Sequence, residues 1–115
     1  MCIRDSTDLA AGYASSTSSW YEEVGSFSKD SVDPFVWSSA AGHYTQVVWG
    51  SVRKVGCGAV NYRETSGSFP YKQLIVCNYY QSGNLQGATM YTPGTACSAC
   101  PTAYPICSDS LCTKM

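Results

Sequence analysis

The placement of the cysteines is the feature that most constrains the fold of this chain of 115 residues. Six of the seven cysteines lie between Cys57 and Cys112, and the seventh, Cys2, stands alone near the start. Cysteine use at this density is typical of secreted proteins, because their compartments keep thiols oxidised. The sequence therefore predicts a secreted, extracellular protein held together by disulfides, and it predicts that Cys2 is a free thiol.

Two alternating runs surround the first pair of these cysteines and predict a β-hairpin. The runs are VRKVGCGAVNYRE, residues 52–64, and YKQLIVCNYYQ, residues 71–81, with TSGSFP between them. Such alternation is typical of paired antiparallel strands, which we expect over residues 55–62 and 71–80. A hairpin symmetric about Gly67 sets Cys57 opposite Cys77, within the Cα separation that a disulfide tolerates. Closing a loop of about 20 residues contributes roughly 3 kcal/mol to stability.

Helical periodicity occurs twice before this hairpin. In WYEEVGSF, residues 20–27, Trp20, Val24 and Phe27 recur at helical spacing, and the preceding SSTSS predicts a cap for a helix that begins near Trp20. SSAAGHYTQVVWG, residues 38–50, fits a second helix over residues 40–49, and we expect Trp49 to be buried. Helices packed on an antiparallel sheet make the predicted fold class α+β.

Composition restricts the classes of function. Hydrophobic residues make up 44% of the chain and charged residues 13%, which is typical of one globular domain rather than a disordered tail. The formal net charge of −1 argues against nucleic acid as a partner, because phosphate binding needs clustered basic residues. No apolar run reaches the roughly 18 residues that a transmembrane segment requires.

The two ends of the chain differ from its middle. Residues 1–12 contain no apolar stretch of a signal peptide, and MCIRDS fits no pattern around it, so we interpret this lead as foreign to the domain. Residues 93–115 carry four cysteines with proline and serine, which predicts a stapled appendage outside the main core. The spacing allows three disulfide connectivities there, and a zinc knuckle is the competing interpretation.

The only histidine of the chain, His43, lies in GHYTQVVWG, residues 42–50. It borders the apolar face that Tyr44, Val47 and Val48 form on the predicted helix. A lone histidine can do chemistry, bind a metal or fill a core, and the sequence around it leaves these three roles open.

Several motifs together resemble the CAP superfamily of cysteine-rich secretory proteins, venom antigens and pathogenesis-related proteins. GHYTQVVW resembles its first signature and LIVCNYYQSGNL, residues 74–85, its second, while WYEE and KVGCG resemble the segments that accompany them. The resemblance covers residues 20–112. It implies a layered α-β-α sandwich that is truncated at its N-terminus, with residues 13–92 as a partial CAP domain and residues 93–115 as its hinge-like, disulfide-stapled tail.

The resemblance also implies a site and a disulfide pattern. Glu23 and His43 match two of the four residues that line the family's cavity, and we expect them to lie within reach of each other, directly or through a water. The other two cavity residues have no counterpart in this chain. One histidine cannot complete a zinc site, so we expect no required cofactor and at most weak zinc binding at His43. The disulfides implied are Cys57–Cys77, Cys97–Cys107 and Cys100–Cys112.

A non-enzymatic extracellular module that binds a lipid, a sterol or another protein is the function that the resemblance implies. The aromatic residues Phe35 and Trp37 of the DPFVW loop are the candidate anchors if they are exposed, and otherwise they seal the core. A toxin-like or channel-modulating protein is one alternative. A hydrolase that uses Glu23 and His43 is another, although no G-x-S-x-G nucleophile elbow is present.

Overall fold

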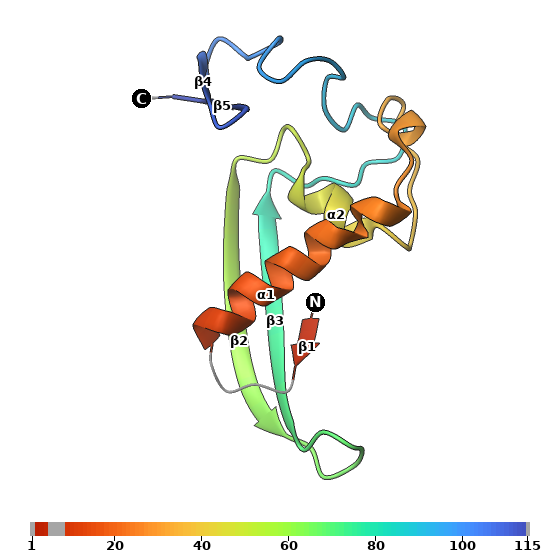
Figure 1. The fold of residues 1–115 in the computed structure, drawn as a ribbon, viewed down its shortest axis with the longest axis vertical. Coiled ribbons are helices and arrows are strands. Elements are labelled where there is room, and N and C mark those ends of the chain that lie inside the picture. Colours follow the sequence, from red (N-terminus) through yellow and green to blue (C-terminus); the bar gives the residue numbers. More distant parts are fainter. Residues whose placement is uncertain (1, 5–8, 115) are drawn as a thin grey trace.

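The computed structural model describes the backbone of residues 2–4 and 9–114 and the side chains of residues 10–114. The side chain of Cys2, predicted to be a free thiol, lies outside this part. Short helices and antiparallel strands confirm the α+β class (Figure 1). In chain order the elements are β1 (Cys2–Arg4), α1 (Leu9–Glu22), η1 (Glu23–Ser26), η2 (Lys29–Ser31), α2 (Gly42–Val47), β2 (Lys54–Arg63), β3 (Tyr71–Tyr80), β4 (Ile106–Ser108) and β5 (Leu111–Thr113).

The long β2–β3 hairpin has the strand register that the sequence predicted. Cys57 pairs with Cys77 across the two antiparallel strands, and their disulfide joins Cα atoms 4.0 Å apart. Gly67 lies in the connecting turn with φ at 107°, a conformation that glycine adopts without steric cost. β1 pairs with the other edge of β3, so the sheet has the order β1-β3-β2.

Helix α1 starts much earlier than the sequence pattern indicated. It begins at Leu9 rather than near Trp20, so SSTSS lies inside the helix and does not cap it, and a 3-10 turn follows in place of its expected last part. Its buried face consists of Gly12, Ser16 and Trp20, one position every fourth residue. A Cβ atom on Gly12 would lie 1.6 Å from the side chain of Gln73, so small residues let α1 cross β3 closely (Figure 1).

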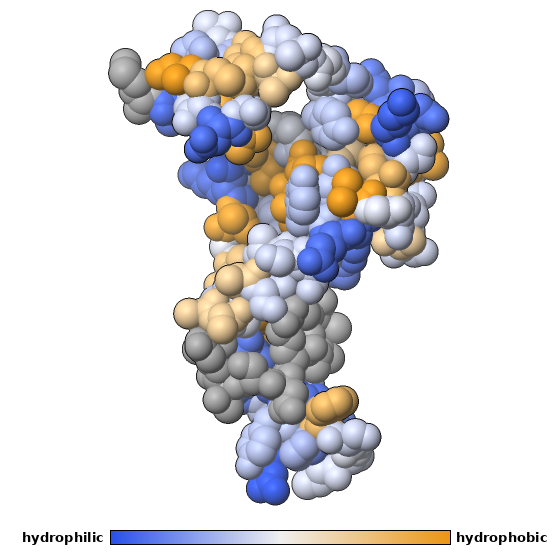
Figure 2. Space-filling model, in the orientation of Figure 1, coloured by the Kyte–Doolittle hydropathy of each residue, from blue (hydrophilic) through white to orange (hydrophobic). Residues whose placement is uncertain are grey.

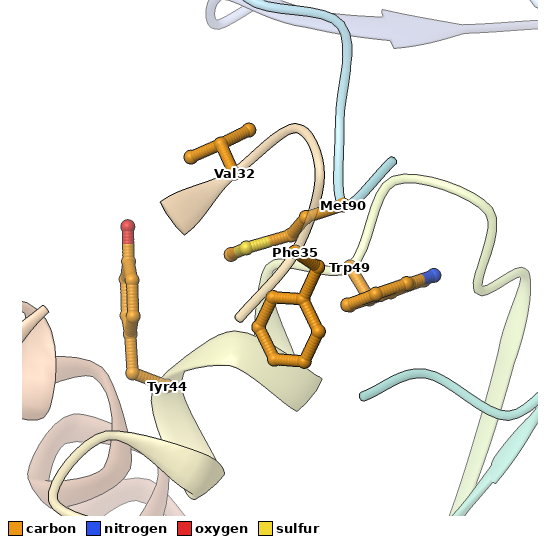
Figure 3. Packing of buried hydrophobic residues seen from close by; sticks show 5 residues of the cluster. All are labelled: Val32, Phe35, Tyr44, Trp49 and Met90. Carbon is orange, nitrogen blue, oxygen red and sulfur yellow. The ribbon is translucent and has the colours of Figure 1, made fainter. Parts of the chain in front are cut away.

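The main hydrophobic cluster lies beside α2 rather than under α1 (Figure 3). Helix α2 is shorter than the expected residues 40–49, but Trp49 is buried as predicted. The Phe35 ring meets the Trp49 ring edge-to-face, with centroids 4.9 Å apart. The cluster comprises Val32, Phe35, Tyr44, Trp49 and Met90.

The loop that precedes α2 places the two candidate aromatic anchors, Phe35 and Trp37, in different surroundings. Phe35 is fully buried, so of the two alternatives left open for it, sealing the core is the one observed, whereas Trp37 is 50% exposed. Phe35 is held inward because its N–H donates to the Ala88 carbonyl, and its own carbonyl accepts from the Gly87 N–H. These two bonds pin the loop to a distant segment, which the local sequence does not reveal.

The cysteine-rich tail lies outside the main core, as expected. Its β4–β5 hairpin stands apart from the helices at the end of the molecule opposite the long hairpin's turn (Figure 1). Both predicted disulfides, Cys97–Cys107 and Cys100–Cys112, are present. A cation–π contact, with the Arg53 guanidinium 4.8 Å from the centre of the Tyr104 ring, also joins the tail to the body.

Candidate functional site

A cleft of about 520 Å³ opens between the end of α1, the loop before α2, α2 itself and the end of β3. Cavities of this size suit a small ligand or part of a larger one. In the view of Figure 2, hydrophobic side chains gather in the upper half of the molecule, while the far end of the long hairpin is mostly hydrophilic. The lining combines aromatic, amide and hydroxyl groups: Trp20, Trp37, Ser39, Gly42, His43, Gln46, Cys77, Asn78, Tyr79, Ser82 and Asn84.

The expected contact between Glu23 and His43 is present at this cleft. Oε1 of Glu23 lies 2.7 Å from Nδ1 of His43. Because an ionised carboxylate can only accept hydrogen bonds, Nδ1 carries the proton of this hydrogen bond. This arrangement fixes the tautomer of the histidine.

Glu23 also caps α2 from outside the helix. Its Oε2 accepts the backbone N–H groups of His43 at 3.0 Å and Tyr44 at 3.1 Å. The residue at the ordinary capping position, Ala41, makes no side-chain hydrogen bond. Glu23 therefore satisfies two of the amide groups that a helix leaves without partners at its start, and it ties the end of α1 to α2.

The His43 ring is held on its face as well as at its edge. It stacks on the Trp20 ring, with centroids 5.7 Å apart and planes 13° from parallel. Trp20 is itself buried in α1, so it is a rigid support. The ring position of His43 is therefore set by two residues from the α1 end of the chain, one aromatic and one acidic.

The surroundings of Glu23 keep its carboxyl group charged. Burial raises the pKa of Glu23, but the hydrogen bond from the His43 ring, the two amide N–H groups and the charge of protonated His43 together hold this pKa below its ordinary value. Hydrogen bonds that favour the ionised form cause such shifts. At neutral pH the site thus contains a carboxylate whose oxygens both accept hydrogen bonds.

Asn84 also lines the cleft, although the sequence did not indicate it as a site residue. Its Oδ1 accepts from the Thr45 hydroxyl at 2.6 Å, and its Nδ2 donates to the Gly42 carbonyl at 3.0 Å. The backbone of Asn84 has φ at 55°, in the left-handed region that asparagine tolerates better than most residues. The Ser-Gly-Asn turn sequence was the available signal, because such residues mark turns with positive φ.

Trp37 lies against Gly42, the first residue of α2, whose missing side chain leaves room for the ring. A Cβ atom on Gly42 would be 2.3 Å from the end of the Trp37 ring, which is shorter than any real contact. The backbone N–H of Trp37 donates to Oε1 of Gln86 at 2.9 Å, which anchors the residue from the other side. Of the two candidate aromatic anchors, Trp37 therefore lines the cleft, while Phe35 belongs to the core.

The donor set around His43 does not fit a zinc site. Zinc takes three or four protein ligands, and both carboxylate oxygens of Glu23 already accept hydrogen bonds. Among residues 10–114, the one group of three or more metal-binding side chains is Cys97, Cys100 and Cys112 in the tail, and all three are in disulfides. Weak zinc binding at His43 stays a prediction.

The helices in the described part of the chain are all too short or too polar to cross a membrane.

Comparison with known proteins gives one family and a set of relatives. Residues 6–79 match the model of the cysteine-rich secretory protein family, CAP. Venom allergen 5 of Tityus serrulatus is 41% identical over 96 residues, which are 84% of this chain and 22% of the relative. Peptidase inhibitor 16 of Mus musculus is 38% identical over 113 residues, which are 95% of this chain and 22% of the relative. Cysteine-rich secretory protein 1 of Mus musculus is 39% identical over 106 residues, 90% of this chain and 40% of the relative.

Proposed function

Because this chain belongs to the cysteine-rich secretory protein (CAP) family, we propose that it acts outside the cell as a binding module whose cleft takes an amphipathic ligand, such as a fatty acid or a sterol. The names of its relatives, a venom allergen and a secretory protein among them, support the extracellular location. The chain spans about a fifth to two fifths of the length of these relatives, so this function concerns the cleft rather than a whole protein.

The half-exposed indole of Trp37 is the observation that supports this function most. The other two tryptophans, Trp20 and Trp49, are buried, with exposed fractions of 6% and 4%, whereas Trp37 is 50% exposed at the cleft. Exposed aromatic rings at a concave site supply a large contact area with few rotatable bonds. The ring suits the apolar part of a ligand, and the hydroxyl and amide groups of the lining suit its polar end.

In this function Glu23 and His43 shape the cleft rather than catalyse a reaction. Glu23 holds the start of α2 and orients the His43 ring, which lines the cleft. The same pair is also what a hydrolase needs to activate water, and Ser39 and Ser82 line the same cleft. Hydrolysis of ester or peptide substrates that is lost in His43→Ala would favour that alternative over simple binding.

Quenching of tryptophan fluorescence by acrylamide tests the proposal, because Trp37 is the exposed tryptophan among the described residues. Sodium palmitate and cholesterol sulfate serve as probes. We expect one of them to protect Trp37 from the quencher in a saturable way, and we expect Trp37→Ala to weaken binding, measured by calorimetry, about tenfold.

Phe69→Ala is the matched control, since Phe69 is an aromatic residue 61% exposed in the turn of the long hairpin, away from the cleft. It should bind the probes as the wild type does. Binding that is equally sensitive to both substitutions, or no binding of either probe, would contradict the proposed function.

A further inference from the structure

The four tail cysteines lie close enough together for their two disulfides to exchange partners. The sulfur atoms of Cys97, Cys100 and Cys112 are all within 4.8 Å of one another, and the sulfur of Cys107 is bonded to that of Cys97. The two disulfides are thus neighbours and not isolated crosslinks. Exchange requires that a thiolate reach a disulfide sulfur, and this cluster brings every potential attacking sulfur next to a potential target.

One half of a second pairing, Cys107 with Cys112, fits the register of the backbone as it stands. Cys107 lies directly opposite Cys112 on the β4–β5 hairpin. Opposed residues of antiparallel strands have Cα atoms about 4.5–5.5 Å apart, within the range of disulfides. Cys57 and Cys77, opposed in the same way, are already bonded in this chain. The remaining two, Cys97 and Cys100, form a Cys-x-x-Cys segment, a spacing common in exchangeable disulfides.

Two backbone features favour such a rearrangement. Cys97 has φ at 61°, a conformation disfavoured for residues other than glycine, so its backbone is strained in the existing pairing. The β4–β5 turn has positive φ at both Asp109 and Ser110, as in the tight turns that hairpins favour, so the turn itself favours the register that sets Cys107 opposite Cys112.

We infer that the tail is a thiol–disulfide exchange site, in which an external thiol converts the pairs Cys97–Cys107 and Cys100–Cys112 into Cys97–Cys100 and Cys107–Cys112. The external thiolate attacks the sulfur of Cys107, an exposed residue, forms a mixed disulfide and releases Cys97 as a thiolate. Cys97 attacks Cys100 and releases Cys112, which then attacks Cys107 and displaces the external thiolate. The thiol is regenerated, and no net oxidation or reduction occurs.

The exchange changes which segments of the tail the two disulfides connect. The existing disulfides span 10 and 12 residues and both join the segment around Cys97–Cys100 to the β4–β5 hairpin. In the rearranged form each disulfide closes within its own segment, so neither links the two. The contact of Arg53 with Tyr104, two residues before β4, then stays as a non-covalent link between the tail and the body.

Disulfide mapping after thiol treatment tests this inference. The protein carries Cys2→Ser, so that the six paired cysteines are the only ones present, and reduced glutathione is the probe. Samples are quenched in acid, where thiolates are protonated, and digested with pepsin for mass spectrometry. We expect the Cys97–Cys100 and Cys107–Cys112 peptides to increase about tenfold over an incubation without glutathione. Cys57–Cys77 is the internal control and should stay intact.

A trapping variant gives a second measurement. Cys107→Ser leaves Cys97 without its partner, and Cys97 should attack Cys100 and transfer the free thiol to Cys112. Alkylation should then label both Cys97 and Cys112, whereas Cys57→Ser, which frees Cys77 in the isolated disulfide, should be labelled at Cys77 alone. If glutathione only reduces the tail disulfides without forming the new pairs, or if the label in Cys107→Ser stays on Cys97, the inference is overturned.

Discussion

Replacement of Glu23 tests whether this one side chain joins α1 to α2. Glu23→Gln keeps the shape of the side chain and one oxygen that can accept from the two amide groups of α2. It removes the negative charge and the oxygen that accepts from Nδ1 of His43. Hydrogen bonds to charged groups contribute about 1.5–3 kcal/mol, so we expect a loss of about 1–2 kcal/mol in the free energy of unfolding. Glu23→Ala, which also leaves two helix amides without partners, should cost about 2–4 kcal/mol.

Urea unfolding at a series of pH values is the assay, and the pH dependence follows from the lowered pKa of Glu23. A carboxyl whose pKa is lower in the folded state stabilises the fold at pH values above its unfolded pKa, which for Glu is about 4.3. That stabilisation is lost as the pH falls through the folded pKa. The stability difference between wild type and Glu23→Gln should therefore be full at pH 7 and should shrink below about pH 4.

The neighbouring Glu22 provides the control, because it is exposed and belongs to the same turn of chain. Glu22→Gln should change the unfolding free energy by less than about 0.5 kcal/mol. The reasoning is refuted if the two glutamate variants are equally stable at pH 7. It is refuted as well if the deficit of Glu23→Gln stays the same in acid.

Three further predictions concern the core, the cleft wall and the metal. Phe35→Ala should lower the free energy of unfolding, measured in urea, by about 3–5 kcal/mol, because it removes a fully buried ring. Trp37→Ala should lower it by less than about 1 kcal/mol. Equal losses would contradict the assignment of Phe35 to the core and Trp37 to the surface. Gly42→Ala should displace the Trp37 ring, and acrylamide quenching should rise; unchanged quenching would show that the ring does not depend on this glycine. Zinc chloride should bind no tighter than about 100 μM by calorimetry; tight binding that is lost in His43→Ala would show a zinc site.

The sequence predicted those features that depend on local pattern or on symmetry. The register of β2 and β3 followed from alternation and from the position of Cys57 and Cys77 about Gly67, and both strands lie where they were expected. Helix α1 was missed because its buried face uses Gly12 and Ser16, which carry no hydrophobic signal although they permit close packing. Small residues at a close contact between a helix and a strand do not produce the periodic pattern of large apolar residues by which a helix is predicted.

The arrangement of the site could be predicted only in part for a related reason. The pairing of Glu23 with His43 was expected from the family resemblance, but the capping of α2 by Glu23 was not, because the two are 20 positions apart and belong to separate elements. Phe35 and Trp37 occupy one short loop and are similar in character, so nothing local distinguishes the buried ring from the exposed one. Bonds to residues 86–88 make that distinction.

The central claim, that the cleft beside Trp37 binds an amphipathic ligand, is tested most directly by NMR of the tryptophan indole N–H groups. The chain has three tryptophans, each with one indole N–H signal, and single Trp→Phe variants assign them. On titration with sodium palmitate or cholesterol sulfate, the Trp37 signal should shift and saturate with the affinity measured by calorimetry, while the signal of Trp49, buried in the core, should stay in place. A Trp37 signal that does not move while either probe binds would contradict the claim.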